Sequence, residues 1–131
     1  MTGVSGVYET VLYADDVLAA AAFYSDVVGL RAIDPPDPHS AAFRLDDGSL
    51  LLLFEAARSA ALGRFVPSHG TQGDGHVAFR VDDLEATRAQ LAKSGTEVER
   101  EITWPLGGSS VYVRDPAGNS VEFVEGEIWD A

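Results

Sequence analysis

Two residues able to bind a metal ion open two similar segments of the chain, Glu9 in residues 9–17 and His76 in residues 76–84. Each segment reads as a short strand that ends in Asp-Asp and leads into a helix. A pattern that returns half a chain later indicates one structural unit used twice. Because the chain has no cysteine, a metal bound here would need imidazole or carboxylate ligands.

The same order of elements is predicted in both halves of the chain: a strand, a helix and three further strands. Turn signals at Asp47-Gly48 and at 115–118 mark a hairpin at the end of each half. The first half is expected to have strands at 7–14, 30–33, 41–46 and 49–54 and a helix at 17–24. The second half is expected to have strands at 75–82, 97–102, 109–114 and 119–125 and a helix at 84–93. These elements predict an α+β fold of two βαβββ modules that form a curved mixed sheet with a cupped site.

The ends of the two helices and the boundaries of the modules follow from the same signals. Asp15 or Asp16 can cap the first helix, Gly29 suits its C-terminal end, and Asp82 and Glu85 have the spacing of a capping box before the second. We expect a single domain over 1–131, with module one at about 7–54, a connector at 55–74 and module two at 75–125.

Alternation along the strands predicts that titratable side chains share one face of the sheet. The opposite face, where helices pack, takes the apolar positions Val77, Phe79, Val81, Val111, Val113, Val121 and Phe123. The polar face then carries Glu9, His76, Arg80, Tyr112, Arg114 and Glu122. Titratable groups gathered inside a small protein are costly unless they pair or bind something.

The net charge of −12 argues against several classes of partner. Nucleic-acid binding depends on neutralising phosphates with Lys and Arg, and the chain has nine of these against 21 acidic residues. We therefore expect no nucleic-acid or membrane partner. No signal peptide is visible at the N-terminus and no apolar stretch is long enough to span a bilayer, so a cytoplasmic protein is expected.

Residues 7–125 resemble the vicinal oxygen chelate superfamily, which includes glyoxalase I, bleomycin-resistance proteins, fosfomycin-resistance thiol transferases and extradiol dioxygenases. The resemblance rests on Asp16 to Tyr24 and Val27 to Leu30 in the first half. In the second half it rests on Gly75 to Phe79, Val81 to Leu84 and Arg114 to Phe123. It is specific for the fold and much less so for the chemistry, because one fold hosts many reactions.

The resemblance implies a metal site made of Glu9, His76 and Glu122. The fourth position of the family pattern falls on Leu52, which cannot bind a metal, and the first position is commonly His or Gln in glyoxalase-like members. One imidazole and two carboxylates suit a divalent ion (Fe, Mn, Zn, Ni or Mg) and leave positions open for a substrate. The leading function is therefore a metal-dependent enzyme of glyoxalase or dioxygenase type, acting on a small oxygenated molecule. Glu9 or Glu122 would serve as the catalytic base, and Tyr112 and Arg114 would orient the substrate.

Other interpretations stay open. A site without metal would pair the carboxylates with Arg80 or Arg114 and leave His76 simply hydrogen-bonded. Such a protein would sequester an antibiotic in an apolar groove lined by residues such as Tyr13, Phe54, Trp104 and Tyr112. His69 either caps the site and moves protons or lies in an exposed loop, and Arg80 and Arg114 either form salt bridges or recognise an anionic substrate group. A domain without any ligand is a third option. The resemblance also implies a homodimer, with the site in one chain or across the interface.

Overall fold

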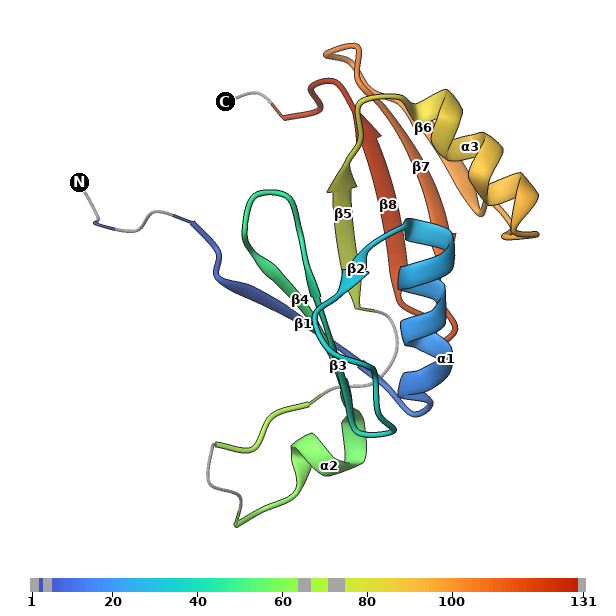
Figure 1. Ribbon diagram of the computed structural model, residues 1–131. Coiled ribbons are helices and arrows are strands. Elements are labelled where there is room, and N and C mark those ends of the chain that lie inside the picture. Colours follow the sequence, from blue (N-terminus) through green and yellow to red (C-terminus); the bar gives the residue numbers. More distant parts are fainter. Residues whose placement is uncertain (1–2, 4–5, 64–66, 71–74, 130–131) are drawn as a thin grey trace. The chain divides into compact units, whose positions relative to one another are not determined.

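The computed structural model describes residues 3, 6–63, 67–70 and 75–129 (Figure 1). Parts of the predicted connector, 64–66 and 71–74, lie outside these residues. The chain divides into two compact units, Met1–Gln72 and Gly73–Ala131. Each unit contains one four-stranded mixed sheet, so the α+β prediction of two similar modules is confirmed. The grouping of both units into one domain stays a prediction.

Unit 1 has the strand order β1-β4-β3-β2, in which β1 runs parallel to β4 and the other pairs are antiparallel. Its elements are β1 (Glu9–Ala14), α1 (Val17–Ala22), a π-helical turn η1 (Phe23–Val28), β2 (Arg31–Ala32), β3 (Ser40–Arg44), β4 (Leu50–Glu55) and α2 (Ala56–Ala60). Helix α1 packs on β1, β3 and β4. Its buried Val17, Ala20 and Ala21 meet the buried face of the sheet, which explains why small residues fill this helix.

Unit 2 repeats this topology with the order β5-β8-β7-β6, again with one parallel pair, β5 with β8. Its elements are β5 (His76–Arg80), α3 (Leu84–Lys93), β6 (Arg100–Thr103), β7 (Ser109–Arg114) and β8 (Ser120–Glu125). Helix α3 packs on β7 and β8 through buried Leu84 and Leu91. The helix-facing side of the sheet holds Val111, Val113, Val121 and Phe123, all buried, as the alternation predicts.

The two sheets have equivalent registers. Glu9 lies opposite Leu50 in unit 1, just as His76 lies opposite Ser120 in unit 2. Two residues further along, Leu52 lies opposite Val11, and Glu122 lies opposite Ala78. Leu52 therefore occupies in unit 1 the place that Glu122 occupies in unit 2.

Capping side chains fix where the two main helices begin. Asp16 accepts a hydrogen bond from the Ala19 N–H at 3.0 Å, and Asp83 accepts one from the Ala86 N–H at 3.1 Å. The capping box predicted at Asp82 is wrong by one residue. The chain is still held beside β8 at Val81, whose N–H donates to the Val124 carbonyl, so the helix begins only at Leu84 and Asp83 becomes its cap.

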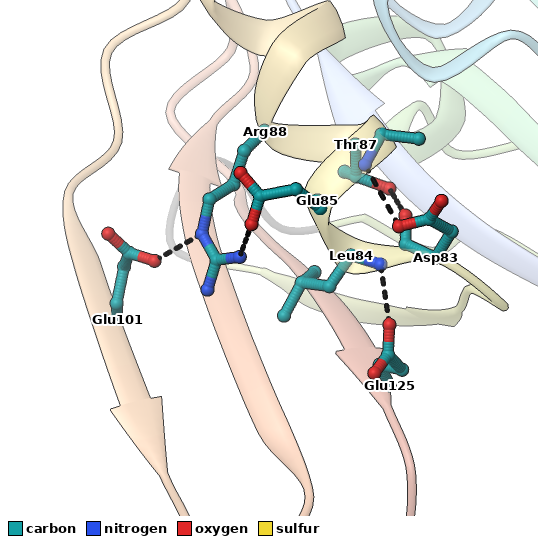
Figure 2. A network of polar contacts seen from close by, with 8 residues as sticks. Asp83, Leu84, Glu85, Thr87, Arg88, Glu101 and Glu125 are labelled. Atoms are coloured by element: carbon teal, nitrogen blue, oxygen red, sulfur yellow. Dashed lines mark hydrogen bonds and ion pairs between the residues drawn. The ribbon is translucent and has the colours of Figure 1, made fainter.

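Polar contacts tie α3 to its sheet in Figure 2. The Leu84 N–H at the start of the helix donates to Glu125 at the end of β8, at 2.7 Å. Arg88 donates to Glu101 on β6 at 2.6 Å and to Glu85 one turn earlier at 3.0 Å. The carboxylate of Glu125 therefore satisfies a free N–H at the positive end of the helix, and Arg88 links the helix to the edge strand.

Some elements differ from the sequence-based expectation. The predicted helix 17–24 splits into α1 and the wider turn η1, and Gly29 ends this turn with φ 87°, a conformation that glycine adopts without strain. The predicted connector begins with a short helix, α2, where alanines follow β4 directly. Strand β6 begins at Arg100 rather than at residue 97. Among the described residues, no helix is long and apolar enough to cross a membrane.

Candidate functional site

The polar face of the unit 2 sheet brings His76 and Glu122 together. His76 begins the edge strand β5, and Glu122 lies in the middle of β8, the neighbouring strand. Their Nε2 and Oε1 atoms are 3.1 Å apart. Glu122 is only 4% exposed, whereas the side chain of His76 is 48% exposed. A buried carboxylate thus meets an imidazole that solvent or a ligand can reach.

The hydrogen bonds of His76 decide which atom faces Glu122. Nδ1 lies 3.1 Å from the Ser120 carbonyl, which can only accept, so Nδ1 carries a proton and donates it. In the neutral ring Nε2 then presents a lone pair to the carboxylate. Nε2 and Oε1 would then be two hydrogen-bond acceptors only 3.1 Å apart, and their lone pairs would repel each other. Either a proton on Nε2 or a metal ion bound to both atoms removes this repulsion.

The second oxygen of Glu122 is held by a chain of hydrogen bonds. Ser110, which is fully buried, donates to Oε2 at 2.6 Å. The indole N–H of Trp104 donates to the Ser110 oxygen at 2.8 Å. Ser110 lies on β7, diagonally across from Glu122 in the ladder, so both side chains share a face. This network satisfies a buried charge that would otherwise cost several kcal/mol.

Tyr112 completes the same face. It lies directly opposite Glu122 in the β7–β8 ladder, and its ring stacks on His76 with centroids 6.2 Å apart. Burial raises the pKa of the Tyr112 phenol, and a hydrogen bond to Glu122 adds to this effect. The phenol is therefore kept neutral as a hydrogen-bond partner beside the carboxylate.

Glu9, the third predicted ligand, is exposed at the start of β1 in the other unit. Within the described part of the chain, no three His, Asp or Glu side chains gather into a metal site. What unit 2 offers by itself is a pair of ligands. The participation of Glu9 in the same site stays a prediction.

In unit 1, three of the predicted substrate-binding residues lie together. The Tyr13 hydroxyl shares a hydrogen bond with His69 Nδ1, and the rings of Tyr13 and Phe54 each lie 5.7 Å from the His69 ring. Burial raises the pKa of Tyr13. His69 is thus an exposed loop residue, as one of the two sequence-based interpretations expects, and it lies against an aromatic face that neither interpretation described.

Hollows occur in each unit, but neither contains the His76–Glu122 pair. One of about 180 Å³ in unit 1 is lined by residues that include Pro35, Leu52 and Phe54. One of about 290 Å³ in unit 2 lies at Glu97, Glu99 and Arg114. Both are smaller than the roughly 300–1,000 Å³ typical of drug-sized pockets.

The two predicted arginines have carboxylate partners. Arg80 lies 3.6 Å from Glu127, with both side chains largely exposed. Arg114 donates to both oxygens of Glu99, at 2.9 and 3.1 Å, and holds the pKa of that carboxyl below its usual value. The salt-bridge interpretation describes these contacts.

Sequence reasoning missed two residues of this face, Ser110 and Arg100. Arg100 is exposed and lies opposite Tyr112 in the β6–β7 ladder, so it shares the face of Tyr112 and Glu122. Ser110 alternates with Tyr112 along β7, and this alternation was the available signal. Arg100 lies within the strand predicted at 97–102, but its position opposite Tyr112 depends on the pairing of β6 with β7, which alternation along one strand does not report.

Comparisons with known proteins place this geometry in a family. Residues 6–123 match the model of the Glyoxalase/Bleomycin resistance protein/Dioxygenase superfamily. A lactoylglutathione lyase of Haemophilus influenzae is 33% identical over 126 residues, which cover 91% of each chain. A lactoylglutathione lyase of Salmonella typhimurium is 26% identical over 128 residues, covering 88% of this chain and 89% of the relative.

Solved structures agree. The crystal structure of a lactoylglutathione lyase from Agrobacterium tumefaciens has a TM-score of 0.89 and 38% identity, and the match covers 99% of this chain and 100% of that one. A glyoxalase/bleomycin resistance protein from Catenulispora acidiphila has a TM-score of 0.70 and 25% identity, with coverage of 94% and 100%. The chain belongs to the Glyoxalase/Bleomycin resistance protein/Dioxygenase superfamily. Its similarity to lactoylglutathione lyases supports a glyoxalase-type function within that family.

The donor chemistry of the His76–Glu122 pair fits a divalent metal. Because Nδ1 donates its proton to the Ser120 carbonyl, Nε2 keeps its lone pair, and a metal-bound histidine usually makes such a bond from its other ring nitrogen. A carboxylate oxygen already lies beside it. The pair therefore supplies two suitable ligands and leaves further positions to other groups.

Proposed function

We propose that this protein is a metal-dependent lyase of the glyoxalase type that acts on a glutathione adduct of a 2-oxoaldehyde. The names of its relatives support the substrate class, since lactoylglutathione is the thioester isomer of such an adduct. The observation that carries the proposal is the buried Glu122 carboxylate, whose Oε1 lies beside the Nε2 lone pair of His76.

The reaction needs a base that moves a proton between two adjacent carbons of the adduct. A carboxylate fixed next to the substrate can take the proton from one carbon and return it to the other. Glu122 suits this role because a hydrogen bond from Ser110 holds it in place and its Oε1 lies 3.1 Å from Nε2 of the half-exposed His76. Glu9 is the second carboxylate proposed for this role.

His76, Glu122 and Glu9 would hold the metal ion. When bound, a divalent metal supplies Lewis-acid polarisation of the two neighbouring substrate oxygens. Leu52 takes no part in this set, because its apolar side chain replaces the carboxylate that the equivalent register position holds in unit 2.

Tyr112 and Arg100 are proposed to bind the substrate. Tyr112 remains neutral and can donate a hydrogen bond from beside Glu122. Arg100 places an exposed guanidinium on the same face, two strands away from Glu122. A guanidinium is the preferred partner of a carboxylate, which a glutathione adduct carries. Tyr13, Phe54, His69, Arg80, Trp104 and Arg114 remain the further candidates for contact with the ligand.

The test compares two substitutions of similar chemistry. Glu122→Gln is expected to lower turnover of the glutathione–methylglyoxal adduct by about 10²- to 10⁴-fold, the usual contribution of a positioned base. Glu55→Gln is the matched control, because Glu55 also pairs with a histidine, His39, at 3.2 Å but at an exposed site. Both are assayed with divalent metal added, by the ultraviolet absorbance of the thioester. Equal rates in the two variants would contradict the proposal.

One observation favours a second function, the sequestration of an apolar antibiotic without metal. Unit 1 carries Leu52 instead of an acidic ligand and gathers Tyr13, Phe54 and His69 into an aromatic cluster. This alternative predicts drug-dependent thermal stabilisation of the metal-free protein, and no turnover of the adduct. A homodimer is expected under both functions and is measured by light scattering.

A further inference from the structure

We propose that Ser110 and Trp104 are positioning residues that make Glu122 present a single oxygen, Oε1, to the metal ion. This inference rests on the proposed function, because it assumes that Glu122 binds metal. It assigns a role to two side chains that stand behind the ligand, on β7 and in the loop before it.

The direction of the hydrogen bonds carries the argument. An indole N–H can only donate, so the Ser110 oxygen must accept from Trp104. Ser110 has one proton of its own, and its short 2.6 Å contact with Oε2 uses that proton. A carboxylate oxygen can only accept, so Oε2 of Glu122 receives a charge-assisted bond from Ser110 while the Trp104 indole occupies a lone pair of the Ser110 oxygen.

Burial protects the hydrogen bond between Ser110 and Glu122 from exchange with water. Ser110 has no exposed surface, so water cannot replace its bond to Oε2. The main chain of Trp104 is held by its own loop. Its backbone N–H donates to the Gly108 carbonyl, and its backbone carbonyl accepts from the Gly107 N–H. These main-chain bonds place Trp104, and the bond from its indole to Ser110 orients the ring, so much of the cost of ordering the carboxylate is met in folding.

The opposite oxygen is left for the ligand. Oε1 lies 3.1 Å from Nε2 of His76, whose side chain is half-exposed. Tyr112 lies directly opposite Glu122 in the β7–β8 ladder, on the same face as this network. If the Ser110 bond is removed, the carboxylate can rotate and offer both oxygens to a metal ion.

The test uses Co²⁺, whose visible absorption spectrum reports the number and geometry of its ligands. Ser110→Ala is expected to weaken Co²⁺ binding by about 10- to 100-fold, the usual effect of losing a hydrogen bond to a metal ligand. It is also expected to change the spectrum of the bound ion. Ser109→Ala is the matched control, because it removes a hydroxyl from the neighbouring position of β7, on the opposite face. This control should bind Co²⁺ as the unmodified chain does.

A second variant keeps the test decisive if Ser110→Ala does not fold, as judged by circular dichroism. Trp104→Phe retains Ser110 but removes the indole N–H that donates to its oxygen and helps to hold it, so it should weaken Co²⁺ binding, and by less than Ser110→Ala. Unchanged affinity and spectrum in both variants, or in Trp104→Phe alone if only that variant folds, would overturn this inference and leave the proposed function standing. A failure of the unmodified chain to bind Co²⁺ would overturn both.

Discussion

Asn119→Ala should be among the most destabilising single changes in unit 2. Asn119 is 2% exposed, in the turn between β7 and β8. Its Oδ1 accepts from the Gly75 N–H at 3.0 Å, and its Nδ2 donates to Asp115 Oδ2 at 3.0 Å. The first bond holds the chain just before His76 against β8, and the second satisfies the buried Asp115. This side chain therefore ties the site to the turn.

The magnitude follows from the groups that lose a hydrogen-bond partner. Alanine removes both bonds, so the Gly75 N–H and the carboxylate of Asp115, which is 5% exposed, each lose one partner. An unsatisfied buried polar group costs roughly 1–3 kcal/mol, so we expect a loss of about 2–5 kcal/mol in the free energy of unfolding. That is a large share of the roughly 5–15 kcal/mol that stabilises a typical protein.

Urea denaturation followed by circular dichroism measures this loss, with Ser49→Ala as the matched control. Ser49 occupies the equivalent turn of unit 1, where its hydroxyl bonds only to the exposed Asp47. Its replacement should change stability by less than about 0.5 kcal/mol. The reasoning is refuted if Asn119→Ala is no less stable than Ser49→Ala.

Three further predictions concern a helix cap, an ion pair and the core. In thermal denaturation, Asp83→Ala should lower the free energy of unfolding by about 1 kcal/mol, whereas Asp82→Ala should leave it nearly unchanged. A larger loss in Asp82→Ala than in Asp83→Ala would show that Asp82 is the helix cap. Arg114→Gln should raise the pKa of Glu99 toward its ordinary 4.5 in an NMR titration, and an unmoved pKa would contradict the assigned cause. Because the folded-state pKa of Glu99 is depressed, its stabilisation is present above the unfolded pKa and is lost as the pH falls through the folded one. Phe43→Ala should cost about 3–5 kcal/mol in chemical denaturation, since Phe43 is fully buried against Tyr24, and a cost below about 1 kcal/mol would show that the core of unit 1 is misassigned.

Much of the fold was predictable because local signals and the repeat agree. Asp-Gly at 47–48 and the glycine at 118 mark turns at which both glycines have positive φ, and the hairpins form around them. Alternation correctly separated buried Val121 and Phe123 from Tyr112 on the other face. The boundaries that failed, at β6 and at Asp82, depend on pairing with distant strands, which local sequence does not report.

The candidate site was predictable only in part. Periodicity and the family resemblance led to His76 and Glu122, which lie 3.1 Å apart. Neither revealed Ser110, because a buried serine becomes meaningful only when its hydrogen-bond partners are known, and Trp104 was expected only as a residue that lines the ligand groove. The placement of Glu9 beside this pair remains a prediction, as do the roles given to His69, Arg80 and Arg114.

Metal analysis of protein purified without a histidine tag tests the central claim, that His76 and Glu122 together hold a divalent ion. We predict a stoichiometric transition metal in the unmodified chain and its loss in His76→Ala and Glu122→Ala. The control His39→Gln alters the exposed ion pair between His39 and Glu55 and should retain the metal. Full retention of the metal in His76→Ala and Glu122→Ala would contradict the claim, as would a metal-free unmodified chain that still converts the adduct.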